Sequence, residues 1–366
     1  MNDKSTQVNQ YKCESCGANL VFDPDSGNLI CPHCETQIEL SRDNDVKERD
    51  FSDLTKTENL WDKEKVHSYK CVNCGSQTVM EKSEISSTCP FCGSAVVVDQ
   101  EALASVKPDT VIPFEVNTNT AVDALLKWRK RRWLAPNAFR KMVGVDEMKG
   151  VYHPMWTFDG YTTTAYEGRL GRTRTRVVTR NGKTTTQTYI EWFNVRGTRR
   201  NTFDDIIISG AETIDQKNLD KLQPFEQSKY CVYSDQYLAG YVASNYTLAP
   251  EKAFEIAKDK MKKVIQSEIM QHHNANHVDY LNLNMHFDAK SFKYLMLPIY
   301  VTATKFKEKV FNQFVAGVVT QQKKKSQIKV AGKSPLSPIK VTLLSLGIAI
   351  GIGLLGWLMA ISGFFA

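Results

Sequence analysis

Alternating apolar and polar residues predict β-strands with one buried face across much of residues 107–320. The segment VTATKFK, from Val301 to Lys307, is typical of this period-two pattern. Two segments instead repeat apolar residues at helical spacing, one from about Thr120 to Trp133 and one from Glu251 to about Gln271. These patterns predict short strands combined with two long helices.

The predicted strands and helices occur in two similar halves. The first half has strands at Val111–Phe114 and around Gly150–Thr164, and the second half has strands at Leu238–Ala243 and around Tyr294–Thr304. In each half the strand after the helix contains a proline between apolar residues, at Pro154 and at Pro298. Short strands with one long helix per half predict an internally duplicated α+β domain with an antiparallel sheet.

Eight of the nine cysteines form one unit that occurs twice before this domain. Each unit is two CxxC pairs separated by fourteen residues, and the second unit lies 58 positions after the first: Cys13, Cys16, Cys31 and Cys34, then Cys71, Cys74, Cys89 and Cys92. Four thiolates brought together by two tight turns form a tetrahedral zinc shell. We therefore predict two zinc ribbons, each with one structural Zn²⁺ ion.

Rubredoxin-like iron is the main alternative to zinc, because four thiolates suit either metal. The duplicated ribbons favour structural zinc. Four protein ligands leave no open coordination position, so hydrolytic catalysis at these sites is not expected. The ninth cysteine, Cys231, lies in an apolar run and is expected to be a buried, inert thiol. This cysteine usage is typical of a reducing cytosol and not of a secreted disulfide scaffold.

Residues 341–366, at the C-terminal end, contain no charged side chain. As a helix this run would be about 39 Å long, whereas a membrane core is about 30 Å thick. Lysines precede the run, so the positive-inside rule places the N-terminal part in the cytoplasm. The sequence thus predicts a single-pass, tail-anchored protein of the cell membrane that contacts membrane lipids. Gly347 and Gly351 form a GxxxG pattern that is compatible with self-association.

The formal net charge of +7 is concentrated in one segment. Residues 321–340 contain six lysines and no acid, so the remainder carries 41 basic and 40 acidic residues and gives no general indication of nucleic-acid binding. The predicted order is zinc ribbon 1 (1–40), a charged connector (41–66), zinc ribbon 2 (67–100), the central domain (107–320), a basic juxtamembrane segment (321–340) and the transmembrane helix (341–366).

Two basic clusters are candidate anion-binding surfaces. Arg172, Arg174 and Arg176 share one face of a predicted strand before an Asn-Gly turn; they either bind phosphates and headgroups or form a solvated hairpin. The segment Lys127–Trp133 interleaves basic residues with tryptophans, as in a nucleic-acid contact or an amphipathic helix with its tryptophans inward. The structural interpretation is favoured for both clusters.

No complete catalytic motif is present. The segments 182–184 (GKT) and 332–334 (GKS) match only the end of a P-loop, because the required upstream glycine is absent. His272, His273 and His277 lie near a predicted helix end without an HExxH motif or a nearby carboxylate. We therefore predict that the chain is not an enzyme.

Several stretches together resemble a bacterial family. They are the two cysteine units, Val111–Phe114, the KGVYHPMWTFD segment Lys149–Asp159 and the apolar C-terminal run. This combination resembles proteins usually labelled transcription factor IIB type zinc-ribbon proteins, or primosomal-helicase-like proteins. The incomplete P-loop argues against a transfer of helicase activity. Some relatives are found beside a phage shock protein A homologue, so the resemblance implies partners among envelope-stress membrane proteins.

The sequence therefore predicts a membrane-anchored zinc-ribbon scaffold or adaptor that binds protein partners at the cytoplasmic face of the membrane. The alternative is a membrane-tethered zinc-ribbon protein that binds nucleic acid through its two basic clusters. The two hypotheses differ in salt dependence, because phosphate binding weakens steeply as salt rises.

Overall fold

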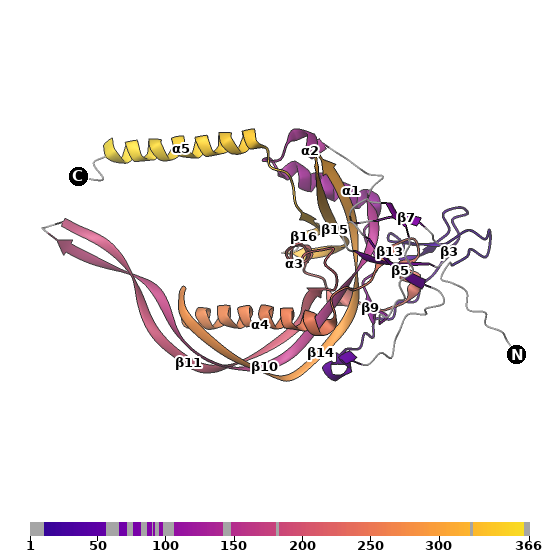
Figure 1. Cartoon of the computed structure of the whole chain (residues 1–366), viewed down its shortest axis with the longest axis horizontal. Coiled ribbons are helices and arrows are strands. Elements are labelled where there is room, and N and C mark those ends of the chain that lie inside the picture. Colours follow the sequence, from indigo (N-terminus) through magenta and orange to yellow (C-terminus); the bar gives the residue numbers. More distant parts are fainter. Residues whose placement is uncertain are drawn as a thin grey trace.

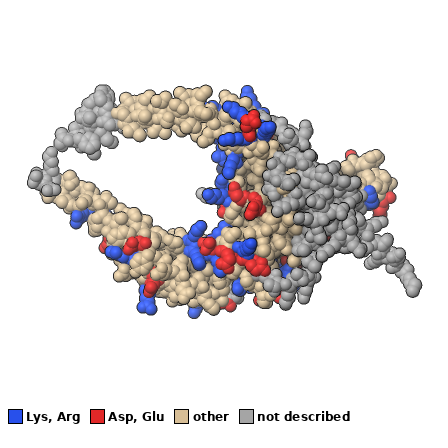
Figure 2. Space-filling view, viewed as in Figure 1, with Lys and Arg blue, Asp and Glu red and all other residues tan. Residues whose placement is uncertain are grey.

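The computed structural model describes residues 11–55, 66–71, 76–81, 86–89, 91, 95–97, 106–141, 148–180, 183–322 and 325–361. Its main feature is a strongly curved sheet with a long hairpin that protrudes beyond the rest of the fold (Figure 1). The hairpin and the C-terminal helix extend as two arms from the same side of the molecule. Figure 2 shows open space between the two arms.

The bounds of the elements are as follows. The strands are β1 (Val21–Asp23), β2 (Asn28–Ile30), β3 (Gln37–Ile38), β4 (Arg49–Asp50), β5 (Val66–Lys70), β6 (Gln77–Glu81), β7 (Ser86–Thr88), β8 (Ala95–Val97), β9 (Thr110–Val111), β10 (Lys149–Arg180), β11 (Lys183–Ser209), β12 (Cys231–Val232), β13 (Val242–Ser244), β14 (His277–Phe306), β15 (Lys309–Gln322) and β16 (Lys325–Gly332). The helices are α1 (Thr118–Arg131), α2 (Asn137–Lys141), α3 (Gln216–Leu222), α4 (Pro250–His272) and α5 (Pro338–Ile361), with 3₁₀ turns η1 (Phe51–Thr55), η3 (Gln227–Lys229) and η4 (Asp235–Leu238).

Eleven of the described strands form one sheet. Its central path runs β12-β9-β14-β10-β13-β6-β5, while β11 pairs with β10, β15 with β14, β16 with β15 and β4 with β14. The longest strands, β10, β14 and β11, contain 32, 30 and 27 residues. β10 lies antiparallel between the other two, with Val151 opposite Ile299 on β14 and Thr164 opposite Arg199 on β11. These three strands form the curved part of the sheet.

Side chains alternate between two buried faces at the centre of the sheet, as the strand period requires. One face carries Tyr152 and Trp156 in a core that includes residues of α1, α4 and the first cysteine unit. The other face carries Val151 and Met155 in a core that includes residues of α3 and the second cysteine unit. Both cysteine units therefore contribute to the cores that cover the sheet.

Equivalent contacts recur in two parts of the sheet. β9 runs parallel to β14, and β13 runs parallel to β10. The indole Nε1 of Trp156 donates to the carbonyl of Leu248 at 3.0 Å, and the hydroxyl of Tyr300 donates to the carbonyl of Val116 at 2.7 Å. Each pair joins a long strand to the segment just before a helix, α4 in one case and α1 in the other.

The prediction of an α+β fold is wrong, because strands predominate and eleven of the described strands form one large sheet. β5 and β6, from the predicted second ribbon, and β4, from the predicted connector, all pair into this sheet. The predicted short strands are also much longer, since β10 continues to Arg180. The physical reason is backbone pairing: β11 and β14 bond to the two edges of β10, which keeps its polar Thr- and Arg-rich part extended.

No helix within the described part of the chain is both long and apolar enough to cross a membrane. The prediction of a transmembrane helix at 341–366 is therefore wrong. The predicted single-pass, tail-anchored membrane localisation, which depended on that helix, is not supported either. Lys340 in the first turn of α5 donates to the carbonyls of Trp133 and Ala135, which fixes the base of this helix beside α1 and α2.

Candidate metal centre

The first cysteine unit folds as two tight turns that bring their sulfur atoms together. The N–H of Gly17 donates to the carbonyl of Cys13 at 2.8 Å, and the N–H of Glu35 donates to that of Cys31 at 2.9 Å. Gly17 and Glu35 close their turns with positive φ angles of 75° and 60°. Glycine adopts this conformation readily, whereas it is uncommon for a residue with a side chain.

The four sulfur atoms of this unit have the spacing of a metal-binding site. Cys13 Sγ lies 3.5 Å from Cys34 Sγ, and Cys16 Sγ lies 3.4 Å from Cys31 Sγ. All four Sγ atoms lie within 4.8 Å of one another. Zn–S bonds of about 2.3 Å in a tetrahedron place the sulfurs roughly 3.8 Å apart. The cluster is therefore compatible with zinc binding.

The first turn also favours a thiolate at Cys13. Burial raises the pKa of this thiol, but hydrogen bonds outweigh that effect and lower its pKa to about 6. They come from the backbone N–H groups of Cys16 and Ser15 and from the thiols of Cys34 and Cys16. A thiolate is the form that binds metal.

The cysteine turns are attached to the central sheet on their inner side. Cys13 and Cys31 are buried in the core that contains Tyr152 and Trp156. The strand β1 is held from outside the unit, because the N–H of Phe22 donates to the carbonyl of Ala239 at 2.9 Å and its ring packs against Tyr237. Asp25 accepts two bonds, at 3.0 and 3.1 Å, from Asn117, the N-cap residue of α1. A metal ion held by this unit would stabilise its contact with the sheet.

The second cysteine unit is described only in part. Cys71 and Cys89 are buried in the core beneath α3, and Ser76 Oγ lies 3.3 Å from Cys89 Sγ. Cys74 and Cys92 lie outside the described residues, so the predicted second metal site stays a prediction. The strand β6 of this unit pairs with β13 of the central sheet.

The arginines of the predicted anion-binding hairpin bind to groups of the protein itself. Arg174 Nε lies 3.0 Å from Glu191 Oε2, and Arg176 donates two bonds to Gln187 Oε1. The guanidinium of Arg172 stacks over the ring of Phe193, 4.3 Å from its centroid. These contacts agree with the interpretation of a solvated hairpin. They also leave fewer guanidinium N–H groups to bind phosphate.

The second basic cluster, Lys127–Trp133, is divided between the core and the surface. Arg129 is 1% exposed, and its Nη2 donates to Thr304 Oγ1 at 2.6 Å. Arg132 stacks on Trp128, with 4.4 Å to the ring centroid, whereas Trp133 is 54% exposed. The expected inward position of the tryptophans therefore holds for Trp128, which is half-buried against the core, but not for the exposed Trp133. The buried face of α1 contains Arg129, an arginine that was expected in water.

The remaining sequence candidates do not converge on one site. His273 Nε2 lies 3.2 Å from the Tyr166 hydroxyl, and His277 Nε2 lies 3.0 Å from Thr173 Oγ1. Cys231 is buried, its Sγ contacts Asn44 Oδ1 at 3.3 Å, and burial raises its pKa. A buried thiol with a raised pKa is a poor nucleophile.

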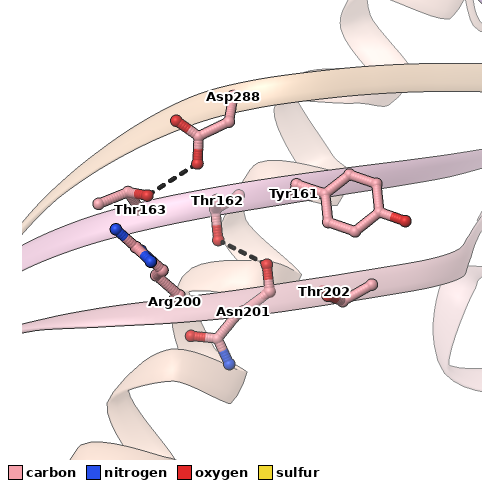
Figure 3. A pocket seen from close by; sticks show the side chains of 7 residues that line it. All are labelled: Tyr161, Thr162, Thr163, Arg200, Asn201, Thr202 and Asp288. Carbon is pink, nitrogen blue, oxygen red and sulfur yellow. Dashed lines mark hydrogen bonds between the residues drawn. The ribbon is translucent and has the colours of Figure 1, made fainter.

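A shallow polar pocket of about 470 Å³ lies across β14, β10 and β11 (Figure 3). Tyr161, Thr163, Arg200 and Asp288 line it, and Thr163 Oγ1 donates to Asp288 Oδ2 at 2.7 Å. These residues lie on the side of the sheet opposite α4. Sequence reasoning did not select this pocket, because its residues come from three strands that are distant in the chain.

A second group that sequence reasoning missed lies in the sheet, where Asp159 is buried, Asp205 is half-buried and Asp204 is exposed. The carboxylates of Asp159, Asp204 and Asp205 lie close enough together to hold a metal ion. Asp159 is the last residue of the KGVYHPMWTFD segment, which was the only sequence signal for this position.

Comparisons with known proteins give limited guidance. No protein-family model and no solved structure match the chain. The chain is 28% identical over 261 residues to the uncharacterized protein YdjG of Bacillus subtilis (strain 168), a match that covers 71% of this chain and 72% of YdjG. Membership of the zinc-ribbon family therefore stays a prediction that rests on the sequence motifs.

Proposed function

We propose that this chain is a zinc-stabilised scaffold that binds a protein partner and performs no catalysis of its own. The observation that carries the proposal is the closed cysteine cluster, in which four protein thiols supply every ligand of a tetrahedral ion. Cys13 and Cys31 lie in the core that covers the central sheet. Zinc at this position stabilises the fold and offers no open coordination position for a substrate.

The partner-binding surface in this proposal is the outer face, the side of β14, β10 and β11 that lies opposite α4. Three large aromatic side chains are exposed there: Tyr161 at 59%, Tyr280 at 49% and Trp192 at 39%. Arg169 lies opposite Tyr280 and stacks over Trp192. Arg200 lies opposite Thr163, in the pocket that Tyr161 also lines (Figure 3). Aromatic residues and arginine are the types that contribute most to protein interfaces.

The resemblance to the zinc-ribbon family suggests an envelope-stress protein, a phage shock protein A homologue, as the partner to test. Titration calorimetry with the purified homologue should give saturable binding. Trp192→Ala or Tyr161→Ala should weaken it at least tenfold, because truncation of an aromatic hot spot costs about 2 kcal/mol or more, which is about 30-fold in affinity. Trp133→Ala is the matched control, since Trp133 is exposed on another part of the molecule.

Equal affinities for the Trp192→Ala and Trp133→Ala proteins would exclude the outer face as the binding surface. Nucleic-acid binding, the alternative function, is supported less, since Arg172, Arg174 and Arg176 contact their own hairpin and its neighbours. A steep fall in RNA or DNA affinity between low and physiological salt, removed by charge-neutral hairpin variants, would favour that alternative.

A further inference from the structure

The strand β14 has a long edge that no described strand covers. On the side away from β10, it pairs with β4 at residues 291–292, with β9 at residues 295–296 and with β15 from residue 299 onward. From His277 to Lys290, the described strands pair with β14 only on its β10 side. An edge of this kind presents backbone N–H and C=O groups to which a further strand can bond.

A groove of about 360 Å³ lies between this part of β14 and α4. Its apolar part consists of Leu283, Met285 and Phe287 of β14 and Phe254 of α4, and its described lining includes no residue of β10 or β11. α4 lies on the concave side of the strand (Figure 1). Side chains alternate between the two faces of a strand, so a strand added at the open edge would direct every second side chain toward α4.

Lysines give this groove a positive charge. Lys258 and Lys262 of α4 and Lys290 of β14 line it, and its described lining contains no acidic side chain. The Nζ of Lys290 lies 3.9 Å from the ring centroid of Phe51 and 5.3 Å from that of Phe254. Within the described part of the chain, Lys290 contacts these two rings and forms no ion pair. Its ammonium group therefore has hydrogen-bond donors available for a ligand.

The other two lysines form exposed ion pairs within α4. Lys258 Nζ lies 2.6 Å from Glu255 Oε1, and Lys262 Nζ lies 4.0 Å from Asp259 Oδ1. Both carboxylates are largely in solvent, because their side chains are 66% and 73% exposed. Exposed pairs between residues of one helix are weak, so a carboxylate from a ligand can replace them at low cost.

We propose that this groove binds an extended acidic peptide of a partner protein, which joins the open edge of β14 as an added strand. Backbone hydrogen bonds to β14 supply affinity, and acidic residues at alternate positions face Lys258, Lys262 and Lys290. A small organic anion would contact the lysines but leave the strand edge unpaired, so the peptide accounts for more of the observations. The groove lies on the α4 side of the sheet, opposite the outer face, and binding there does not depend on the scaffold proposal.

Fluorescence anisotropy with a labelled, capped peptide that alternates glutamate with threonine tests the groove in the full chain. We expect saturable binding, at least about tenfold tighter than that of the same peptide with glutamine in place of glutamate. Removal of the three groove lysines together should weaken binding by a similar factor, in the protein with Lys258→Gln, Lys262→Gln and Lys290→Gln. The matched control removes the same charge from exposed lysines outside the groove and should keep the original affinity, in the protein with Lys217→Gln, Lys252→Gln and Lys263→Gln.

Methylation of the peptide backbone separates strand addition from attraction between charges alone. One version of the peptide is N-methylated on every glutamate and the other on every threonine, so each version loses the N–H donors along one of its two edges. Only the version whose methylated edge faces β14 should lose binding. This comparison needs no variant of the protein, so it holds even where the lysine variants do not fold.

Four outcomes would overturn the proposal. Equal affinities of the two methylated peptides would exclude strand addition. Equal affinities of the groove and control lysine variants would place the peptide elsewhere on the molecule. Decanoate that displaces the labelled peptide as effectively as the unlabelled peptide does would indicate a site for small anions. No binding of the glutamate peptide would leave the lysines as protection of an open edge against pairing with other chains.

Discussion

Individual buried polar residues in this protein are held by specific hydrogen bonds. His153 is fully buried, and its Nε2 lies 2.9 Å from Ser209 Oγ. Ser209 Oγ lies 2.7 Å from the carbonyl of Ala211 and 3.0 Å from that of Ile214, so its single proton is used there. Ser209 therefore accepts the bond from His153 Nε2–H. This arrangement suits a neutral imidazole.

Acid should destabilise the fold through His153. Burial lowers the pKa of His153 to about 3, whereas an unfolded histidine titrates near 6.5. Between these values only the unfolded chain binds the proton, so the contribution of His153 is complete above about pH 6.5 and is lost as pH falls toward 3. Urea unfolding should give a lower free energy of unfolding at pH 5 than at pH 7. A His153→Gln protein with the same pH difference would contradict this assignment.

At the scale of elements, glycines allow the long strands to approach one another. A Cβ built on Gly168 of β10 would lie 2.5 Å from the carbonyl oxygen of Tyr280 on the neighbouring strand β14. That oxygen belongs to the backbone and cannot move aside as a flexible side chain could. In α5, by contrast, a Cβ on Gly347 meets no atom within 4 Å.

Two glycine substitutions should therefore have opposite effects. Gly168→Ala is expected to lower the free energy of unfolding by about 1–3 kcal/mol, the range for overpacked sites. Gly347→Ala should leave stability unchanged or raise it by up to about 1 kcal/mol, because alanine favours the helix. Denaturant unfolding of the two proteins compares them directly. A loss of stability at Gly347 as large as at Gly168 would show that α5 is closely packed in solution.

At the scale of the whole molecule, the cysteine units are part of the central fold. The first contributes Cys13 and Cys31 to one core, and the second contributes Cys71 and Cys89 to the other. Loss of the metal from the first unit is consequently expected to destabilise the central sheet. An independent, separately folding ribbon would not have this effect.

If the first unit binds zinc as proposed, Cys13→Ser should remove one equivalent of the metal and lower the free energy of unfolding by more than about 4 kcal/mol, a loss typical of metal-site removal. Hydrogen exchange should then become faster in β10 and β14 as well as in β1 and β2. Cys231→Ser is the matched control, since Cys231 is equally buried and its Sγ contacts Asn44 Oδ1 outside the cysteine cluster. Faster exchange confined to β1–β3 would contradict the coupling.

The sequence by itself determined the local features whose causes lie within short segments. The CxxC spacing predicted the cluster of Cys13, Cys16, Cys31 and Cys34, because two residues between cysteines suffice to form each turn. Helical periodicity likewise located α1 and α4, because the spacing of apolar residues that it depends on lies within each helix. A long apolar run, however, led to the wrong prediction of a membrane span.

Only the tertiary structure decided which distant segments meet. The length of β10 depends on its ladders with β11 and β14, and no local pattern reports such pairing. Asp159, Asp205 and Lys293 lie on three different strands, so their shared burial follows from strand register alone. Arg129 is likewise buried in the core, because the side-chain oxygens of Thr304 and Gln313 accept hydrogen bonds from its guanidinium there. Strand pairing and burial between distant segments thus determine the features of this protein that residue spacing alone could not predict.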